Sequence, residues 1–141
     1  LATALEVGVD LAKPNQYEFA EYAGVDANDP DALLSAARQL RRECVPQLIV
    51  SLGAEGALFL KADAEVRAQA PEVQVVSTVG AGDALLAGYL QGLLAGDGCE
   101  GCARRATVYA WSRLESLLPH LPQMEVLDQR LRQVTVLAIG A

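Results

Sequence analysis

The stretch that best indicates the fold is residues 75–88, Val-Val-Ser-Thr-Val-Gly-Ala-Gly-Asp-Ala-Leu-Leu-Ala-Gly. It begins with apolar, strand-like residues, passes through Gly80 and Gly82, and continues in a helical pattern. Glycine has no Cβ, so the backbone can turn tightly there and a ligand can approach it closely. N–H groups at the start of a helix have no partner inside the helix, and together with the helix dipole they favour an anion. The stretch therefore predicts a strand, a turn and a helix, with an anion site at the turn.

Asp83 is the residue in this stretch that a simple anion site does not explain, because a carboxylate repels a phosphate. Its presence is explained if Asp83 accepts a proton from an attacking hydroxyl. The N–H groups of Gly80, Ala81 and Gly82 would then hold the transferring phosphoryl group. The alternative is a glycine-rich turn in which Asp83 is an ordinary acidic residue of the first helical turn. Only the first interpretation predicts chemistry.

The composition indicates one folded domain. The chain has 141 residues, of which 52% are hydrophobic and 21% charged, a balance typical of a globular protein with a proper core. The net charge of −7 argues against a nucleic-acid-binding surface. No apolar run reaches the roughly 18 residues of a membrane span and no basic leader is evident, so we expect no membrane association and a cytoplasmic location.

The three cysteines do not form a disulfide framework. Cys99 and Cys102 have the spacing of half a zinc or redox site, but only His120 and the distant Cys44 could complete it. We therefore expect ordinary thiols in a loop or a first helical turn, and a structural role for His120.

The rest of the chain alternates between strand and helix patterns. Helices are expected at 1–7, 16–22, 30–44, 82–94 and 100–118, with a short one before the last strand; strands are expected at 10–12, 47–52, 57–60, 64–69, 73–76 and 134–137. The turn at 53–56 predicts a hairpin, and the alternation in 64–69 suggests an edge strand. This order predicts an α/β domain with a mainly parallel sheet flanked by helices and a ligand crevice at the carboxyl ends of the strands.

Three segments resemble one known family. Thr78-Val79-Gly80-Ala81-Gly82-Asp83 resembles the second signature of the PfkB/ribokinase family of carbohydrate kinases. Asn15 and Glu18, in Lys-Pro-Asn-x-x-Glu, resemble that family's Asn-x-x-Glu motif, although the same spacing also suits a helix capping box. Residues 51–56 resemble its Ser/Thr-x-Gly-x-x-Gly turn, which borders the nucleotide.

The resemblance implies a set of site residues and two ligands, ATP and Mg²⁺. Asp83 would be the catalytic base, with Gly80, Ala81 and Gly82 forming the anion hole. Asn15 and Glu18 would hold the magnesium indirectly, through water. The residues implied near ATP are Lys13, Asn15, Ser51, Gly53, Glu55, Gly56 and Thr78.

The resemblance also implies a fold and a reaction. The fold would be a ribokinase-like three-layer α/β/α arrangement, of which residues 1–141 form the C-terminal, nucleotide-binding half; the sugar-binding half and lid would be absent. The reaction would be ATP-dependent phosphorylation of a sugar phosphate, most simply fructose 1-phosphate to fructose 1,6-bisphosphate.

Several alternatives stay open. The chain could be a nucleotide-binding or degenerate fragment without activity of its own. Ala84 stands where the phosphofructokinase branch usually has Ser, so fructose 6-phosphate and tagatose 6-phosphate remain alternative substrates. The expected partners are small molecules, and the resemblance leaves open a homodimer of the full-length protein.

One helix departs from the family. Around positions 107–112 the family has small residues that form a wall of the adenine pocket, whereas this chain carries Thr107, Tyr109, Trp111 and Arg113. We expect this bulk to narrow the pocket or to change how the base stacks.

Overall fold

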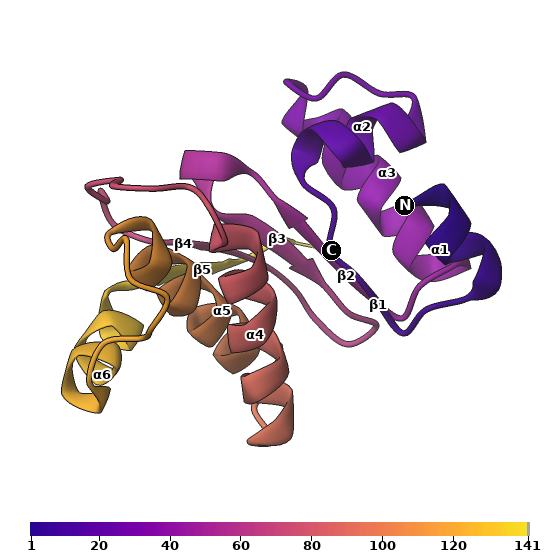
Figure 1. Cartoon of the computed structure of the whole chain (residues 1–141). Helices are drawn as coiled ribbons and strands as arrows, with labels where there is room; N and C mark the ends of the chain where they lie inside the picture. Colours follow the sequence, from indigo (N-terminus) through magenta and orange to yellow (C-terminus); the bar gives the residue numbers. More distant parts are fainter. Residues whose placement is uncertain (141) are drawn as a thin grey trace. The chain divides into compact units, whose positions relative to one another are not determined.

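The computed structural model describes residues 1–140, which form two compact units (Figure 1). Unit 1 comprises Leu1–Glu65 and the chain from Ala138 on, and unit 2 comprises Val66–Leu137. Within the described residues, no helix is long and apolar enough to cross a lipid bilayer.

Unit 1 contains the first part of the predicted order of elements. These are α1 (Ala2–Val7), β1 (Leu11–Ala12), α2 (Gln16–Ala23), α3 (Pro30–Glu43), β2 (Gln47–Ser51), a short 3₁₀ helix η1 (Gly53–Glu55) and β3 (Ala57–Leu60). β4 (Glu65–Gln69) begins in unit 1 and β5 (Thr135–Ala138) ends there. The predicted strands and helices of this unit are confirmed, with small shifts at their ends.

The sheet is mixed rather than mainly parallel. β1 pairs with β2 in parallel, with Leu11 opposite Gln47. β2 and β3 are antiparallel, with Leu48 opposite Leu60 and Ser51 opposite Ala57, which confirms the predicted hairpin. A parallel pair needs a long crossover connection, whereas the turn between β2 and β3 is only a few residues long, so β3 has to run back along β2.

The strand order is β1-β2-β3-β4-β5, so the prediction of an edge strand at 64–69 is wrong. The N–H of Ile139, which directly follows β5, donates to the carbonyl of Glu65 at 2.9 Å. Val66 and Ala68 are buried, whereas Glu65, Arg67 and Gln69, which alternate with them, are more exposed, as the alternation predicted. Alternation reports which face of a strand is buried, and it does not report whether a neighbouring strand is present.

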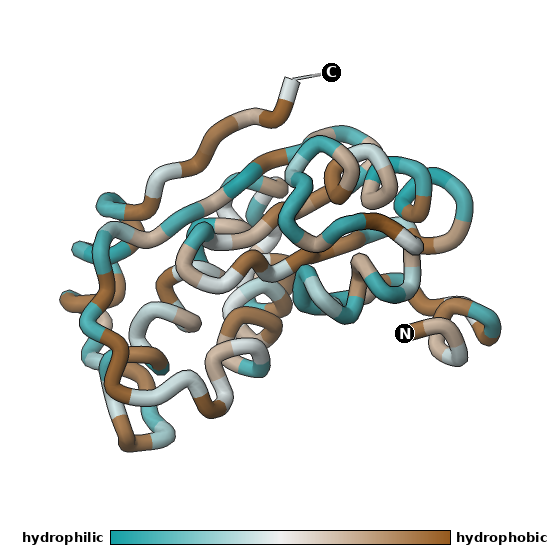
Figure 2. The backbone as a smooth tube through the Cα atoms, turned by 90° about the horizontal axis from the view of Figure 1, so that it is seen from above, coloured by the Kyte–Doolittle hydropathy of each residue, from teal (hydrophilic) through white to brown (hydrophobic). Residues whose placement is uncertain are grey.

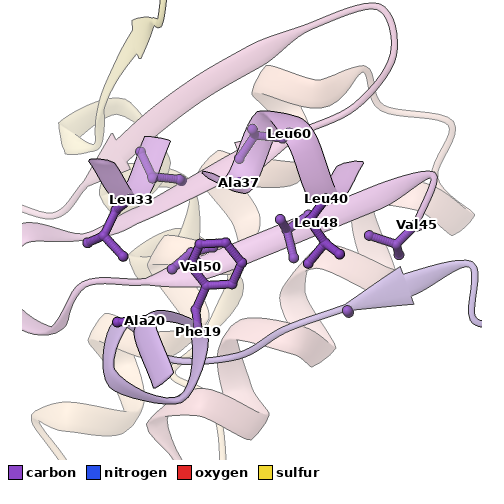
Figure 3. Close-up of a cluster of buried hydrophobic side chains, with 11 residues drawn as sticks. Phe19, Ala20, Leu33, Ala37, Leu40, Val45, Leu48, Val50 and Leu60 are labelled. Carbon is purple, nitrogen blue, oxygen red and sulfur yellow. The ribbon is translucent and has the colours of Figure 1, made fainter. Parts of the chain in front are cut away.

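The core of unit 1 lies between α2, α3 and the sheet (Figure 3). Leu33, Ala37 and Leu40 recur on one face of α3, and Phe19 of α2 is fully buried. Asp29 caps α3 by accepting hydrogen bonds from the N–H groups of Asp31 and Ala32. The buried set contains Ala12, Phe19, Ala20, Leu33, Ala37, Leu40, Val45, Leu48, Val50, Leu58 and Leu60. The hydropathy colouring of Figure 2 shows polar residues interspersed with these apolar ones along the chain.

Unit 2 is built on two closely packed helices, α4 (Ala81–Leu94) and α5 (Cys99–Leu114), followed by α6 (Met124–Gln133). α4 and α5 run side by side in Figure 1. A Cβ on Gly92 would stand 2.9 Å from the Cα of Cys102, so glycine permits the close packing of the two helices. Tyr89 and Leu85 are buried, whereas Leu90 is 43% exposed because the glycine-bearing side of α4 faces α5.

Two expectations for unit 2 need correction. Residues 73–76 form no strand: the N–H groups of Val76 and Ser77 instead donate to the carbonyl of Leu114, at 2.7 and 3.1 Å. A β-branched run becomes a strand only when another strand pairs with it, and here the end of α5 supplies the acceptor. α5 also ends at Leu114 rather than 118, and Leu118 donates its N–H to the hydroxyl of Ser116 in the following turn.

No disulfide joins the three cysteines. Cys99 and Cys102 are buried in the first turn of α5, and Cys44 is exposed. Among residues 1–140, no three His, Cys, Asp or Glu side chains are grouped so that they could hold a metal ion.

Candidate functional site

The candidate residues form two groups, one in each unit. The group in unit 1 follows strands β1 and β2, and the group in unit 2 occupies residues 78–83, which we call the glycine turn. The unit 1 group is Lys13, Asn15, Glu18, Ser51, Gly53, Glu55 and Gly56; the unit 2 group is Thr78, Gly80, Ala81, Gly82 and Asp83.

The structure brings Asn15 and Ser51 together at the carboxyl ends of β1 and β2. The two residues form a parallel bridge, and the N–H of Ser51 donates to the carbonyl of Pro14 at 3.1 Å. Residues that are far apart in the sequence thus meet at the edge of the sheet where parallel-stranded folds bind their ligands.

Asn15 and Glu18 form a complete capping box on α2. The Oδ1 of Asn15 accepts hydrogen bonds from the N–H groups of Tyr17 and Glu18, both at 2.9 Å. The Oε2 of Glu18 accepts from the N–H of Asn15 at 2.9 Å. Both side chains are exposed. Their other polar atoms, Nδ2 of Asn15 and Oε1 of Glu18, make no hydrogen bond within residues 1–140, so the cap leaves them available to a ligand.

A pocket of about 580 Å³ lies between α1, β1 and α2. Lys13, Glu18 and Tyr22 line it together with Leu1, Val9 and Leu11. The pocket therefore presents one ammonium, that of Lys13, and two carboxylates, those of Glu18 and Glu21, among mostly apolar side chains.

The backbone conformation of the 53–56 turn explains why it contains two glycines. Gly53 and Gly56 have positive φ angles of 61° and 87°, which side chains other than glycine rarely adopt. The turn closes where Leu52 donates its N–H to the carbonyl of Gly56 at 2.8 Å.

The glycine turn in unit 2 presents unpaired N–H groups. Gly80 has a φ of 79° and begins α4 without any side-chain cap. The N–H of Ala81 donates to the carbonyl of Thr78 at 3.3 Å, which is long for such a bond. In the described part of the chain, the N–H groups of Gly80, Gly82 and Asp83 have no hydrogen-bond partner. Three donors at a helix start are therefore open to an anion.

Asp83 lies in the first turn of α4, beside these donors. Its side chain is exposed and forms no hydrogen bond or ion pair with any residue from 1 to 140. The carboxylate can therefore accept a proton from a ligand.

Two of the α5 residues that are larger than their counterparts in the family, Thr107 and Trp111, are packed inside unit 2. Trp111 is buried, and the guanidinium carbon of Arg130 lies 4.5 Å from the centre of its ring. Thr107 is buried as well, and its hydroxyl donates to the carbonyl of Ala103 at 2.8 Å. The ring of Trp111 is therefore buried within unit 2, where it contacts Arg130 of α6.

Arg113 is the residue whose importance the sequence analysis missed, since we considered only its size. A Cβ on Gly80 would stand 3.2 Å from Nε of Arg113, so the arginine side chain lies directly against the glycine turn. Nothing in the sequence indicates that Arg113, near the end of α5, contacts the glycine turn that precedes α4.

Comparison with known proteins matches residues 2–120 to the pfkB family carbohydrate kinases. The chain belongs to this family. Among pfkB relatives, the 1-phosphofructokinase of Escherichia coli (strain K12) is 40% identical over 110 residues, which cover 78% of this chain and 35% of that protein. The 1-phosphofructokinase of Rhodobacter capsulatus is 36% identical over 136 residues, covering 96% of this chain and 43% of that protein. The chain thus spans less than half the length of these relatives.

Solved structures confirm a ribokinase-like α/β fold for this pfkB chain. A putative phosphofructokinase from Staphylococcus aureus superposes with a TM-score of 0.84 at 25% identity, covering 96% of this chain and 44% of that one. The ribokinase of Arabidopsis thaliana, complexed with ribose and ATP, superposes with a TM-score of 0.77 at 24% identity over 88% of this chain and 41% of that one. The predicted fold class is therefore confirmed, as part of a larger domain.

Proposed function

We propose that this chain carries the phosphoryl-transfer site of an ATP-dependent sugar-phosphate kinase. The supporting observation is the glycine turn, where three unpaired N–H groups lie beside the exposed carboxylate of Asp83. We further propose fructose 1-phosphate as the substrate and fructose 1,6-bisphosphate as the product, because the relatives at 36–40% identity are named 1-phosphofructokinases.

In this proposal the side chain of Asp83 and the N–H groups of the glycine turn have different roles in the reaction. Asp83 takes the proton of the attacking sugar hydroxyl as that oxygen bonds to the γ-phosphorus, and ADP leaves with the electrons of the broken P–O bond. The N–H groups of Gly80, Ala81, Gly82 and Asp83 hold the oxygens of the transferring phosphoryl group, and that of Ala81 leaves its long bond to Thr78 to do so. Catalysis by this arrangement consists mainly of positioning and of stabilising negative charge.

The residues of unit 1 fit a magnesium-bound nucleotide. Magnesium retains most of its waters in proteins, and Glu18 is exposed with one carboxylate oxygen left over from the capping box. Glu18 and Asn15 would therefore hold a hydrated magnesium ion, which would offset charge on the phosphates. Lys13, Ser51, Gly53, Glu55 and Gly56 would lie near the nucleotide, as would Thr78 of unit 2.

A second candidate is a nucleotide-binding module without activity of its own, since the site residues named above are assigned to the nucleotide, the magnesium and the phosphoryl group rather than to the sugar. The chain covers 35–43% of its named relatives, so residues 1–141 would be the C-terminal nucleotide-binding half, with the sugar-binding residues and lid supplied elsewhere. In either case we propose a cytoplasmic location, and a homodimer of the full-length protein stays a prediction.

A chimaera tests the proposed reaction. The matched segment of the R. capsulatus 1-phosphofructokinase would be replaced by this chain, since the match covers 96% of it. A coupled assay would then measure ADP production with fructose 1-phosphate, fructose 6-phosphate and tagatose 6-phosphate, with the unaltered R. capsulatus protein as the control. We expect turnover with fructose 1-phosphate.

Binding to the chain alone separates the two candidates. Calorimetric titration with magnesium-ATP that shows binding, while the folded chimaera produces no ADP, would support the nucleotide-binding module. A folded chimaera that turns over another sugar phosphate faster than fructose 1-phosphate would overturn the substrate assignment.

A further inference from the structure

Three half-buried arginines of unit 2 form ion pairs. Arg104 pairs with Glu100 at 2.8 Å, Arg105 with Asp97 at 2.5 Å and Arg130 with Glu115 at 2.6 Å. Each of these charges is compensated inside the unit.

Arg113 is half-buried and forms no ion pair within residues 1–140. Its one hydrogen bond there runs from Nη1 to the carbonyl of Ser116, at 2.5 Å. A guanidinium has five N–H donors, so most of its donors and its whole formal charge remain available. In a chain with a net charge of −7, an uncompensated and partly buried cation needs an explanation.

The position of Arg113 supplies that explanation. Nε stands 3.2 Å, and Cδ and Cγ each 4.0 Å, from where a Cβ on Gly80 would be. The side chain thus fills the space that a residue other than glycine would occupy at the start of α4. The unpaired N–H groups of Gly80, Gly82 and Asp83 belong to the same turn. A fixed cation and several backbone donors at one turn are a combination that binds phosphate.

We propose that Arg113 is a phosphate-binding residue of this site, which stabilises the terminal phosphates of the nucleotide from the α5 side. This inference rests on the proposed function, because it takes the glycine turn to be the phosphoryl-transfer site. The bond to the Ser116 carbonyl holds the guanidinium in place, so little side-chain freedom is lost when the phosphate binds.

Two simpler roles for Arg113 make different predictions. If it only satisfies the carbonyl of Ser116 beyond the end of α5, its loss lowers stability and affects every ligand alike. If it acts only through its size and narrows the adenine pocket, its removal improves adenosine binding.

The test compares three probes on the full chain. Magnesium-ATP, adenosine and inorganic pyrophosphate would be titrated calorimetrically into the wild type, Arg113→Ala, Arg113→Lys and the matched charge control Arg132→Ala. Arg132 is exposed on α6 and has no partner among the described residues. Thermal unfolding without ligand would show whether each variant is folded.

We expect Arg113→Ala to weaken magnesium-ATP and pyrophosphate by about tenfold or more, the loss expected for a charge-assisted hydrogen bond, and to leave adenosine unchanged. Arg113→Lys would recover part of the loss because it keeps the charge, and Arg132→Ala would match the wild type.

The outcomes separate this inference from the proposed function. Magnesium-ATP that binds equally well to wild type and Arg113→Ala overturns the role of Arg113 and leaves the proposed function intact. Pyrophosphate binding that depends on Arg113, without any magnesium-ATP binding, supports the role of Arg113 and counts against nucleotide binding. The inference is overturned if Arg113→Ala loses adenosine and ATP affinity in equal measure. It is also overturned if the folded wild type binds none of the probes.

Discussion

Gly88 of α4 lies so close to Arg105 of α5 that a Cβ on residue 88 would stand 2.6 Å from the carbonyl oxygen of Arg105. That oxygen belongs to the backbone, so it cannot swing away as the end of a side chain could. The side chain of Arg105 donates to Asp97 in the connection between the two helices, and this hydrogen bond raises the pKa of the guanidinium. Glycine at position 88 therefore determines how closely the two helices approach.

Replacing Gly88 tests this contact. We expect Gly88→Ala to lower the free energy of unfolding by about 1–3 kcal/mol, because the added methyl group forces α4 and α5 apart. Gly140→Ala, where a Cβ meets nothing within 4 Å, is the control. Chemical denaturation measures both. A gain in stability of about 0.5–1 kcal/mol, the usual effect of Gly→Ala in an open helix, would show that the helices are not in tight contact.

Asn15 combines a structural and a proposed ligand-binding role, and two substitutions separate them. Asn15→Ala removes the cap of α2 and should cost about 1 kcal/mol of stability. Asn15→Asp keeps an equally good cap but replaces the Nδ2 donor with a negative charge. We expect it to preserve stability while weakening magnesium-ATP binding to the chain, measured by calorimetry. Unchanged ATP affinity in a stable Asn15→Asp variant would restrict Asn15 to its capping role.

Asp83 can be tested as a base in the chimaera described above. Asp83→Asn should lower kcat at least about 10²-fold, since Asn cannot accept the proton. Magnesium-ATP affinity should not fall, because the change removes a negative charge beside the phosphates. Asp128→Asn, at an exposed position on α6, is the matched control. Equal losses of turnover and of ATP affinity would make Asp83 a structural residue instead.

Arg130 joins α6 to α5 through three contacts. Its guanidinium lies over Trp111, pairs with Glu115 at 2.6 Å and donates to the hydroxyl of Ser112 at 3.1 Å. We expect Arg130→Ala to cost about 1–3 kcal/mol of stability, through lost packing as well as lost charge. Arg130→Lys should recover only part of it, because an ammonium cannot reproduce the planar contact.

Fluorescence gives a local readout of the same change. Trp111 is the only tryptophan of the chain, and its emission should move to longer wavelength in Arg130→Ala as water reaches the ring. The neighbouring Arg132→Ala should leave both stability and emission as they are. Emission that is unchanged in Arg130→Ala would mean that other side chains keep the ring dry.

Local sequence signals predicted local structure well. The Asn15-x-x-Glu18 spacing predicted a capping box, Asp29-Pro30 predicted a helix start, and the short 53–56 turn predicted a hairpin. In each case the residues that specify the structure also form its hydrogen bonds, so neighbours in sequence were enough.

Predictions that depended on a distant partner were less reliable. Residues 73–76 have strand-like composition, but the N–H groups of Val76 and of the following Ser77 donate to the carbonyl of Leu114 at the end of α5. Residues 64–69 alternate like an edge strand, yet β5 pairs beyond them. A strand needs a neighbour from elsewhere in the chain, and alternation cannot say whether that neighbour exists.

The sequence by itself determined the α/β class, the glycine turn with Asp83 at the start of its helix, and the resemblance that led to the pfkB family. These follow from backbone freedom, helix capping and hydrophobic periodicity, which act within a few residues. Only the tertiary structure decided that Asn15 lies beside Ser51, that Trp111 packs under Arg130, and that Arg113 brings its charge to Gly80. Each of these contacts joins residues far apart in the chain, and their meeting depends on how whole helices and strands pack against one another.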